Sequence, residues 1–125
     1  MNAPVFVDED GDISMYSTIG AAESHLEAQD VIANAYIVYD RNGEMLRQIT
    51  VENQHATVLV KLLPSGEFKQ EDLTRKLLNI LNRIHADVQF NENSALSDIV
   101  AFCIESRILQ WTWDTYQGEI EGEIR

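Results

Sequence analysis

Hydrophobic and polar residues alternate along the chain in a way that predicts several short strands. The runs PVFV (residues 4–7) and ISMY (13–16) flank Asp10-Gly11, which is a strong signal for a tight turn between antiparallel strands. A second hairpin is predicted over residues 35–51, with Asn42-Gly43 as its turn. A further strand is predicted over residues 55–63, ended by Pro64 and the turn sequence PSGE.

Helical spacing of apolar residues marks three other segments. A short helix is predicted over residues 19–29, capped by Ser17 or Thr18. Two longer amphipathic helices are predicted over residues 70–86 and 94–109. Residues 109–116, LQWTWDTY, alternate again and predict a last strand before the acidic segment 117–125.

This order of elements predicts an α+β fold. Strands joined by tight hairpins give an antiparallel β-sheet built from hairpins, with helices packed on one face. No repeat, low-complexity linker or boundary divides the sequence, so we expect a single domain over residues 1–125. Residues 117–125 are compatible either with a strand or with a flexible acidic tail.

Composition narrows the class of protein. The chain has 125 residues, 45% of them hydrophobic, which is ordinary for one globular domain. No apolar run approaches the roughly 20 residues that span a bilayer, and the first residues lack the features of a secretory signal. The single cysteine, Cys103, leaves no partner for a disulfide or a zinc pair. We therefore expect a cytoplasmic protein without a cofactor.

Charge is strong and unevenly placed. The formal net charge is −12, and residues 1–40 contain eight acidic residues with no Lys or Arg. Phosphate contacts need basic side chains, so the sequence disfavours direct nucleic-acid binding. It favours a basic protein partner, whose approach the acidic field would accelerate. The alternative is that the acidity serves solubility alone.

The most acidic stretch, VDEDGDIS, places Asp8, Asp10 and Asp12 at alternate positions, as in a calcium-binding loop. Such a loop needs glycine at its sixth position and a bidentate Glu at its twelfth. Counted from Asp8, these positions are Ile13 and Ile19, so a metal site is not predicted. We instead expect an exposed hairpin tip whose carboxylates contact a partner. The predicted partner-binding carboxylates are Asp8, Glu9, Asp10 and Asp12, extended by Glu23, Glu27 and Asp30.

Signatures of catalysis are missing from the sequence. No glycine-rich phosphate loop, serine nucleophile elbow or ligand-spaced histidine pair occurs. Cys103 lies on an apolar helix stripe and is expected in the core. We therefore predict that the protein is not an enzyme. The alternative is a small hydrolase that uses His25 and the nearby carboxylates, in which case His25 would line a pocket.

Aromatic residues cluster near the end of the chain. Trp111 and Trp113 share one face of the predicted last strand, and Tyr116 follows. Core packing would explain them, but Trp and Tyr are also common interface anchors. We assign all three to the partner-binding set. A further alternative is a structural or regulatory subunit that uses this strand to form an oligomer.

The stretch MYSTIGAAESHLEAQDV, followed by AYIVYDRNGEML, resembles small acidic bacterial immunity proteins of contact-dependent growth inhibition and polymorphic toxin systems. The resemblance covers residues 5–50. Its matching residues are Tyr16, Ala22, Glu23, Leu26, Glu27, Asp30, Val31, Tyr36, Tyr39, Asp40, Gly43 and Leu46.

This resemblance implies a cytosolic protein that binds the catalytic domain of a cognate toxin and covers its active site. Many such toxins are nucleases with basic substrate clefts, which agrees with the charge pattern. The resemblance therefore predicts a cognate toxin protein as the partner, with a basic nuclease domain as the expected type.

Overall fold

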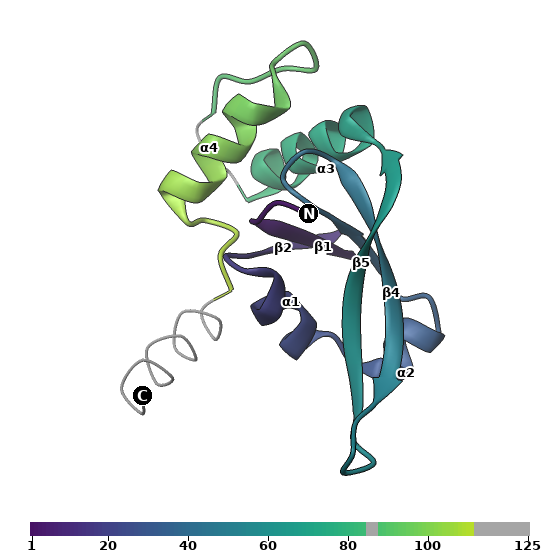
Figure 1. Ribbon diagram of the computed structural model, residues 1–125. Coiled ribbons are helices and arrows are strands. Elements are labelled where there is room, and N and C mark those ends of the chain that lie inside the picture. The colour runs from purple at the N-terminus through teal and green to yellow at the C-terminus, as the bar shows by residue number, and fades with distance from the viewer. Residues whose placement is uncertain (85–87, 112–125) are drawn as a thin grey trace.

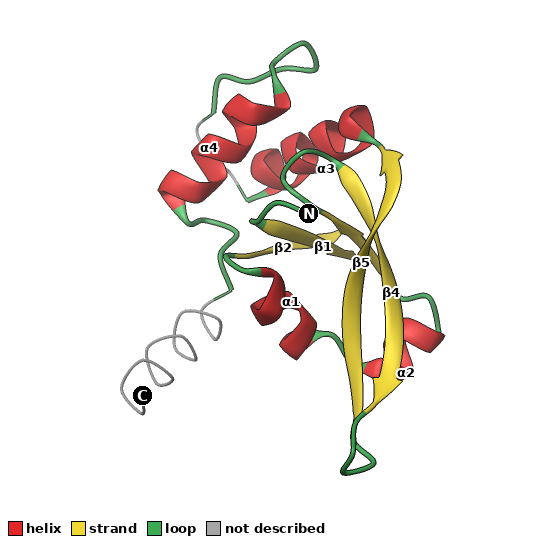
Figure 2. Cartoon of the chain, viewed as in Figure 1, coloured by secondary structure: helices red, strands yellow, loops and turns green. Residues whose placement is uncertain are grey.

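The computed structural model describes residues 1–84 and 88–111, and its elements are shown in Figures 1 and 2. The strands are β1 (Val5–Glu9), β2 (Asp12–Tyr16), β3 (Tyr36–Tyr39), β4 (Glu44–Glu52) and β5 (Val58–Phe68). The helices are α1 (Ile19–His25), α2 (Ala28–Ile32), α3 (Gln70–Arg83) and α4 (Leu96–Ser106). The strands form one antiparallel sheet in the order β2-β1-β3-β4-β5, which confirms the α+β class.

Both predicted hairpin turns are confirmed. Asp10 and Gly11 have positive φ angles of 53° and 93°, the backbone that matches the twist of the flanking strands in a two-residue turn. Between β3 and β4, the Gly43 N–H donates to the Asp40 carbonyl, and Gly43 has φ 82°. The buried Asp40 carboxylate completes this turn by accepting backbone N–H groups from Asn42 and Glu44 at 2.8 and 3.0 Å.

The expected end of β5 at Pro64 is wrong. The strand continues through Pro64, which pairs with Leu46, as far as Phe68. β5 is the edge strand of the sheet, where a missing N–H costs no ladder hydrogen bond. A bulge between Glu44 and Leu46 shifts the register beside this proline, and the Glu44 carboxylate accepts the Gly66 N–H at 2.8 Å.

The helix expected over residues 19–29 is two helices. Thr18 caps α1 by accepting the Ala21 N–H at 3.0 Å, as one of the two predicted caps. Leu26 and Glu27 then have extended backbones, and α2 begins at Ala28. Because the chain changes direction there, residues of the two helices do not share one continuous stripe.

Helices cover both faces of the sheet rather than one. In β1, Val5 and Val7 pack in a cluster with Ala22 and Leu26 of the α1 region. Phe6, on the opposite face, packs in a second cluster with residues of α3 and α4. The run PVFV is apolar at successive positions, which is typical of a strand buried on both faces.

The last described residues cover the β2 edge of the sheet. Met15 donates its N–H to the Leu109 carbonyl at 2.9 Å and accepts the Trp111 N–H at 3.1 Å, which makes a parallel bridge between Met15 and Gln110. This isolated bridge lies within the segment 109–116 for which a last strand is predicted; residues 112–125, which include the rest of that segment and the acidic segment 117–125, lie outside the described residues. Among the described helices, none has the length and apolar character needed to cross a membrane.

Candidate functional site

The carboxylates of the β1–β2 hairpin differ in their surroundings: Asp8 is buried, whereas Glu9 is exposed. Asp8 was expected to be exposed with its neighbours, but it is only 8% exposed. Its Oδ1 accepts the Gly11 N–H at 2.8 Å, and its Oδ2 lies 2.9 Å from the Lys76 ammonium. Because β1 alternates between the two faces of the sheet, Asp8 points toward α3 while Glu9 points the other way. Asp8 therefore contributes to the fold, and the expectation that it is exposed at the hairpin tip is wrong.

Lys76 connects Asp8 to a small polar network beneath α3. Its ammonium lies 2.8 Å from the Tyr39 hydroxyl and 3.5 Å from Asp72 Oδ2. The Tyr39 hydroxyl also donates to the Asp72 carboxylate, and Arg75 pairs with the same group. Lys76 and Asp72 tie α3 to β1 and β3, while Arg75 pairs with Asp72 within α3, so we interpret the network as structural.

The shared contacts raise the pKa values of Tyr39 and Lys76 and lower the pKa of Asp72. Burial, followed by the hydrogen bond to Asp72, raises the pKa of Tyr39 to about 12. That same hydrogen bond lowers the pKa of Asp72 against an opposing effect of burial. Burial disfavours the charged form of Lys76, but its bonds to Tyr39 and Asp8 outweigh it and raise the pKa. At neutral pH the network is therefore an ionised Asp72, a charged Lys76 and a neutral Tyr39.

Glu23 also has a structural role. Its Oε2 accepts the Leu62 N–H of β5 at 2.8 Å, and its Oε1 lies 3.9 Å from the half-exposed Lys61 ammonium. The bond to Leu62 covers a backbone donor on the open edge of the sheet, where unpaired groups invite pairing with another chain. Glu23 is thus separated in function from Glu27, its neighbour four residues along.

Three other acidic residues, Glu9, Glu27 and Asp30, lie beside Tyr36. Glu9 of β1 is the cross-strand partner of Tyr36. From α2, Asp30 accepts the Tyr36 hydroxyl at 3.2 Å, while the Glu27 N–H donates to that hydroxyl at 3.4 Å. Asp10 follows Glu9 in the exposed turn. We call Glu9, Asp10, Glu27 and Asp30 the acidic surface, and Tyr36 lies at its centre.

No Lys or Arg in the described ranges forms an ion pair with any member of the acidic surface. Asp12, at the margin, differs because Arg83 reaches its Oδ1 at 3.4 Å and also donates to the Gly11 carbonyl. Burial raises the pKa of Tyr36, and the charges of Asp30 and Glu9 raise it further, although the Glu27 N–H opposes the shift. Tyr36 is therefore a neutral aromatic group among uncompensated carboxylates.

The aromatic candidates are only partly described. Trp111 is 42% exposed, and its ring meets the His25 ring edge-on with centroids 5.5 Å apart. His25 also lies 5.5 Å from the Tyr16 ring. Trp113 and Tyr116 lie outside the described residues. The His25 ring thus lies between aromatic side chains from β2 and the 109–111 segment.

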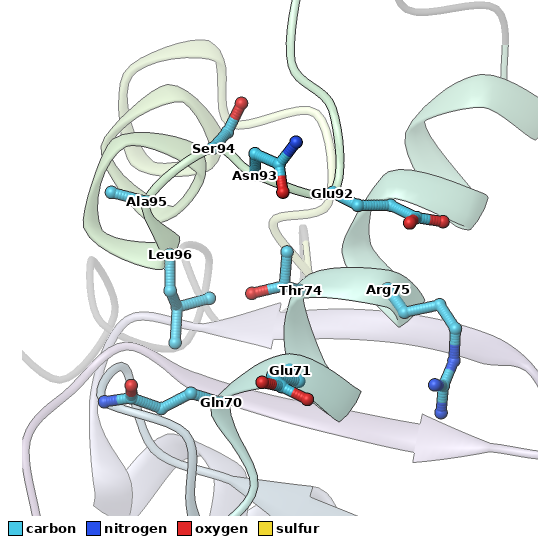
Figure 3. A pocket seen from close by; sticks show the side chains of 9 residues that line it. All are labelled: Gln70, Glu71, Thr74, Arg75, Glu92, Asn93, Ser94, Ala95 and Leu96. Atoms are coloured by element: carbon cyan, nitrogen blue, oxygen red, sulfur yellow. The ribbon is translucent and has the colours of Figure 1, made fainter.

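A cavity of about 470 Å³ lies elsewhere, between the first turns of α3 and the segment 92–96 (Figure 3). Its lining includes the charged residues Glu71, Arg75 and Glu92, the buried Thr74, and Leu96. The pocket that a hydrolase using His25 would need is not this one, because His25 does not line it. The cavity is mostly walled by exposed side chains, and none of the predicted site residues that the structure describes lines it.

The remaining candidates for chemistry in the described ranges are the Cys103 thiol and metal binding. Cys103 is fully buried, and desolvation raises the pKa of its thiol to about 11, so the thiol stays protonated at neutral pH. No group of three or more His, Cys, Asp or Glu side chains within residues 1–84 and 88–111 is arranged to hold a metal ion.

Sequence reasoning missed Tyr36 as the centre of the surface and Lys76 as the partner of Asp8. Tyr36 meets Glu9 only through the pairing of β1 with β3, two strands that are not consecutive. No local pattern specifies that register. The helical spacing of Asp72 and Lys76 was visible, but the strand residues they would contact were not.

No protein-family model, curated protein or solved structure matches this chain significantly. Function is therefore inferred from the charge and geometry of the described residues.

Proposed function

We propose that this protein is an immunity protein that binds and neutralises a cognate bacterial toxin domain, a basic nuclease whose active site it covers. The observation that carries the proposal is the acidic surface: four acidic residues that pair with no Lys or Arg in the described ranges. Beside Tyr36 lie Glu9 across the strands, the Asp30 carboxylate and the Glu27 backbone N–H. Like charges held together cost stability, and a basic partner would remove that cost.

The chemistry of the surface fits a cleft that binds phosphates. Carboxylates can occupy the positions where Lys and Arg side chains of a nuclease hold the substrate backbone. Tyr36 supplies a rigid aromatic group of the kind that anchors interfaces. Glu27, Asp30 and Tyr36 also fall within the stretch that resembles immunity proteins. The net charge of −12 would accelerate the encounter with a basic domain at low salt.

The test is capture of the partner by the immobilised full-length protein from the native organism's lysate, followed by binding measurements with the purified partner. We expect a basic domain at a one-to-one ratio, with affinity that falls as salt rises. A variant with Glu9→Gln, Asp10→Asn, Glu27→Gln and Asp30→Asn should bind at least about tenfold more weakly, because truncating one member of a close charge pair is costly.

The matched control changes four exposed carboxylates elsewhere: Glu52→Gln, Glu71→Gln, Glu92→Gln and Glu105→Gln. None of these forms an ion pair in the described ranges, and the change in net charge is the same. Equal weakening by both variants would mean that only overall charge matters. A partner that is not basic, or whose enzymatic activity is unaffected by binding, would overturn the proposal.

A further inference from the structure

The β4–β5 hairpin has one face that lies outside both core clusters of the described residues. Residues of these strands alternate between faces, and cross-strand pairing matches Arg47 with Leu63, Ile49 with Lys61, and Val51 with Leu59. We call these six residues the outer β4–β5 face. It is aliphatic, with one cation contributed by each strand.

The packing clusters leave this face out, although Ile49, Val51 and Leu63 are partly buried and only Leu59 among its aliphatic residues is exposed. The cluster beneath α3 and α4 takes only Met45 from the two strands. The cluster beneath α1 takes Leu46, Val60 and Leu62, which point to the other side. The four aliphatic residues of the outer β4–β5 face belong to neither cluster, and Leu59 is 38% exposed. Figure 1 shows β4 and β5 extending well beyond α3.

The edge of β5 is less open than its face. Glu23 accepts the Leu62 N–H, and α1 packs against the strand at this point. A partner strand added to the edge would have to displace this carboxylate. An occupant is therefore favoured on the face, where the element that commonly covers an aliphatic sheet surface is an amphipathic helix.

The positive charges of Arg47 and Lys61 indicate which kind of helix would bind to this face. Arg47 is exposed and forms no ion pair with a described carboxylate. Lys61 has only the long, half-exposed contact with Glu23, and such a contact holds a side chain weakly. We propose that the outer β4–β5 face binds an amphipathic helix of another protein, which presents aliphatic side chains flanked by carboxylates opposite Arg47 and Lys61.

This second docking surface is independent of the proposed immunity function. Glu9 and Tyr36 are directly paired on the α1 side of the sheet, together with Val7 and Val38, whereas the outer β4–β5 face points to the other side. The two surfaces also have opposite charge. A partner could therefore occupy one surface without covering the other.

The test uses the full-length protein and two synthetic helical peptides with the same leucine stripe, flanked by Glu in one and by Lys in the other. We expect the Glu peptide to shift the NMR signals of Ile49, Val51 and Leu59, and to bind at least about tenfold more tightly than the Lys peptide, a difference set by charge. Arg47→Glu combined with Lys61→Glu should reverse that order. The control pair Lys69→Glu and Arg107→Glu makes the same charge change at exposed positions elsewhere and should preserve it.

Three results would overturn the proposal: equal binding of the two peptides, signal shifts confined to other surfaces, or a reversed preference in the control pair. Self-association that Leu59→Asp abolishes would identify a second copy of the chain as the occupant instead. Contacts between this face and residues 112–125 of the same chain in the free protein would identify an internal occupant. If Leu59→Asp failed to fold, the reversal by Arg47→Glu and Lys61→Glu would decide, since both replaced side chains are exposed.

Discussion

The Lys76 ammonium lies 2.9 Å from the Asp8 carboxylate and joins the middle of α3 to the end of β1. Both side chains are largely shielded from solvent, at 21% and 10% exposure. Asp8 belongs to the most acidic stretch of the sequence, yet its charge is compensated within the molecule. Its neighbours Glu9 and Asp10 are the ones whose charge faces outward without compensation.

Lys76→Met is expected to destabilise the protein by about 1–3 kcal/mol, because it leaves Asp8 and the Tyr39–Asp72 pair without their shared donor. Urea unfolding followed by circular dichroism would measure this. Lys69→Met is the control, since Lys69 is half exposed in a surface pair with Glu67, and its effect should stay within about 0.5 kcal/mol. Equal effects of the two changes would show that the network contributes nothing specific.

Alkaline pH should destabilise the protein through the same network. The pKa values of Tyr39 and Lys76 are raised in the folded state, so the stability they contribute is complete below their ordinary values and is lost as pH rises through the folded values. For Tyr39 this window runs from 10.0 to about 12. Absorbance at alkaline pH should show one tyrosine titrating near the upper limit, and Tyr39→Phe should remove that step. A step that survives Tyr39→Phe would assign the shift to another tyrosine.

The two turn glycines should differ in their tolerance of alanine. Gly11 and Gly43 both have positive φ, but a Cβ at Gly11 meets open space, whereas one at Gly43 would lie 2.9 Å from the Gln70 Cα. Gly11→Ala is expected to cost about 1–2 kcal/mol from backbone strain alone. Gly43→Ala should cost about 1–3 kcal/mol more, because α3 begins at the point of contact. Thermal unfolding of the two variants would check the difference, and an equal loss would contradict the close approach.

Cys103 should resist alkylation while the protein is folded. Its thiol is buried with a pKa of about 11, so near pH 8 the reactive thiolate is scarce and inaccessible. We expect labelling by iodoacetamide only through opening of α4, with a rate that rises steeply in denaturant. Rapid stoichiometric labelling under native conditions, matching that of the guanidinium-unfolded control, would show that the helix does not seal this cysteine.

The features predicted correctly from the sequence are those that depend on neighbouring residues alone. Asp10-Gly11 and Asn42-Gly43 located both hairpins because their positive-φ residues are read from the dipeptide itself. The break between α1 and α2 was missed because Leu26 continues the apolar spacing of α1 while its backbone is already extended. Burial of Asp8 was missed for a different reason: its partner comes from a helix more than sixty residues later.

The candidate site shows the same limit. Acidic residues of the N-terminal region were identified as a group from charge alone. Their division into Asp8 and Glu23, which hold the fold, and Glu9, Glu27 and Asp30, which surround Tyr36, depends on strand register and on the position of α1 against β5. Register between non-consecutive strands is set by the whole core, and no dipeptide or spacing encodes it.

The bridge between Met15 and Gln110 has a consequence for biosynthesis. β2 leaves the ribosome long before the residues that cover its edge, so a nascent chain exposes that strand throughout most of translation. The partly made sheet can meet neighbouring nascent chains on the same polysome during this interval. Slower translation would lengthen this exposure, so yield in the cell should depend on elongation speed and on chaperone supply as well as on the stability of the finished protein.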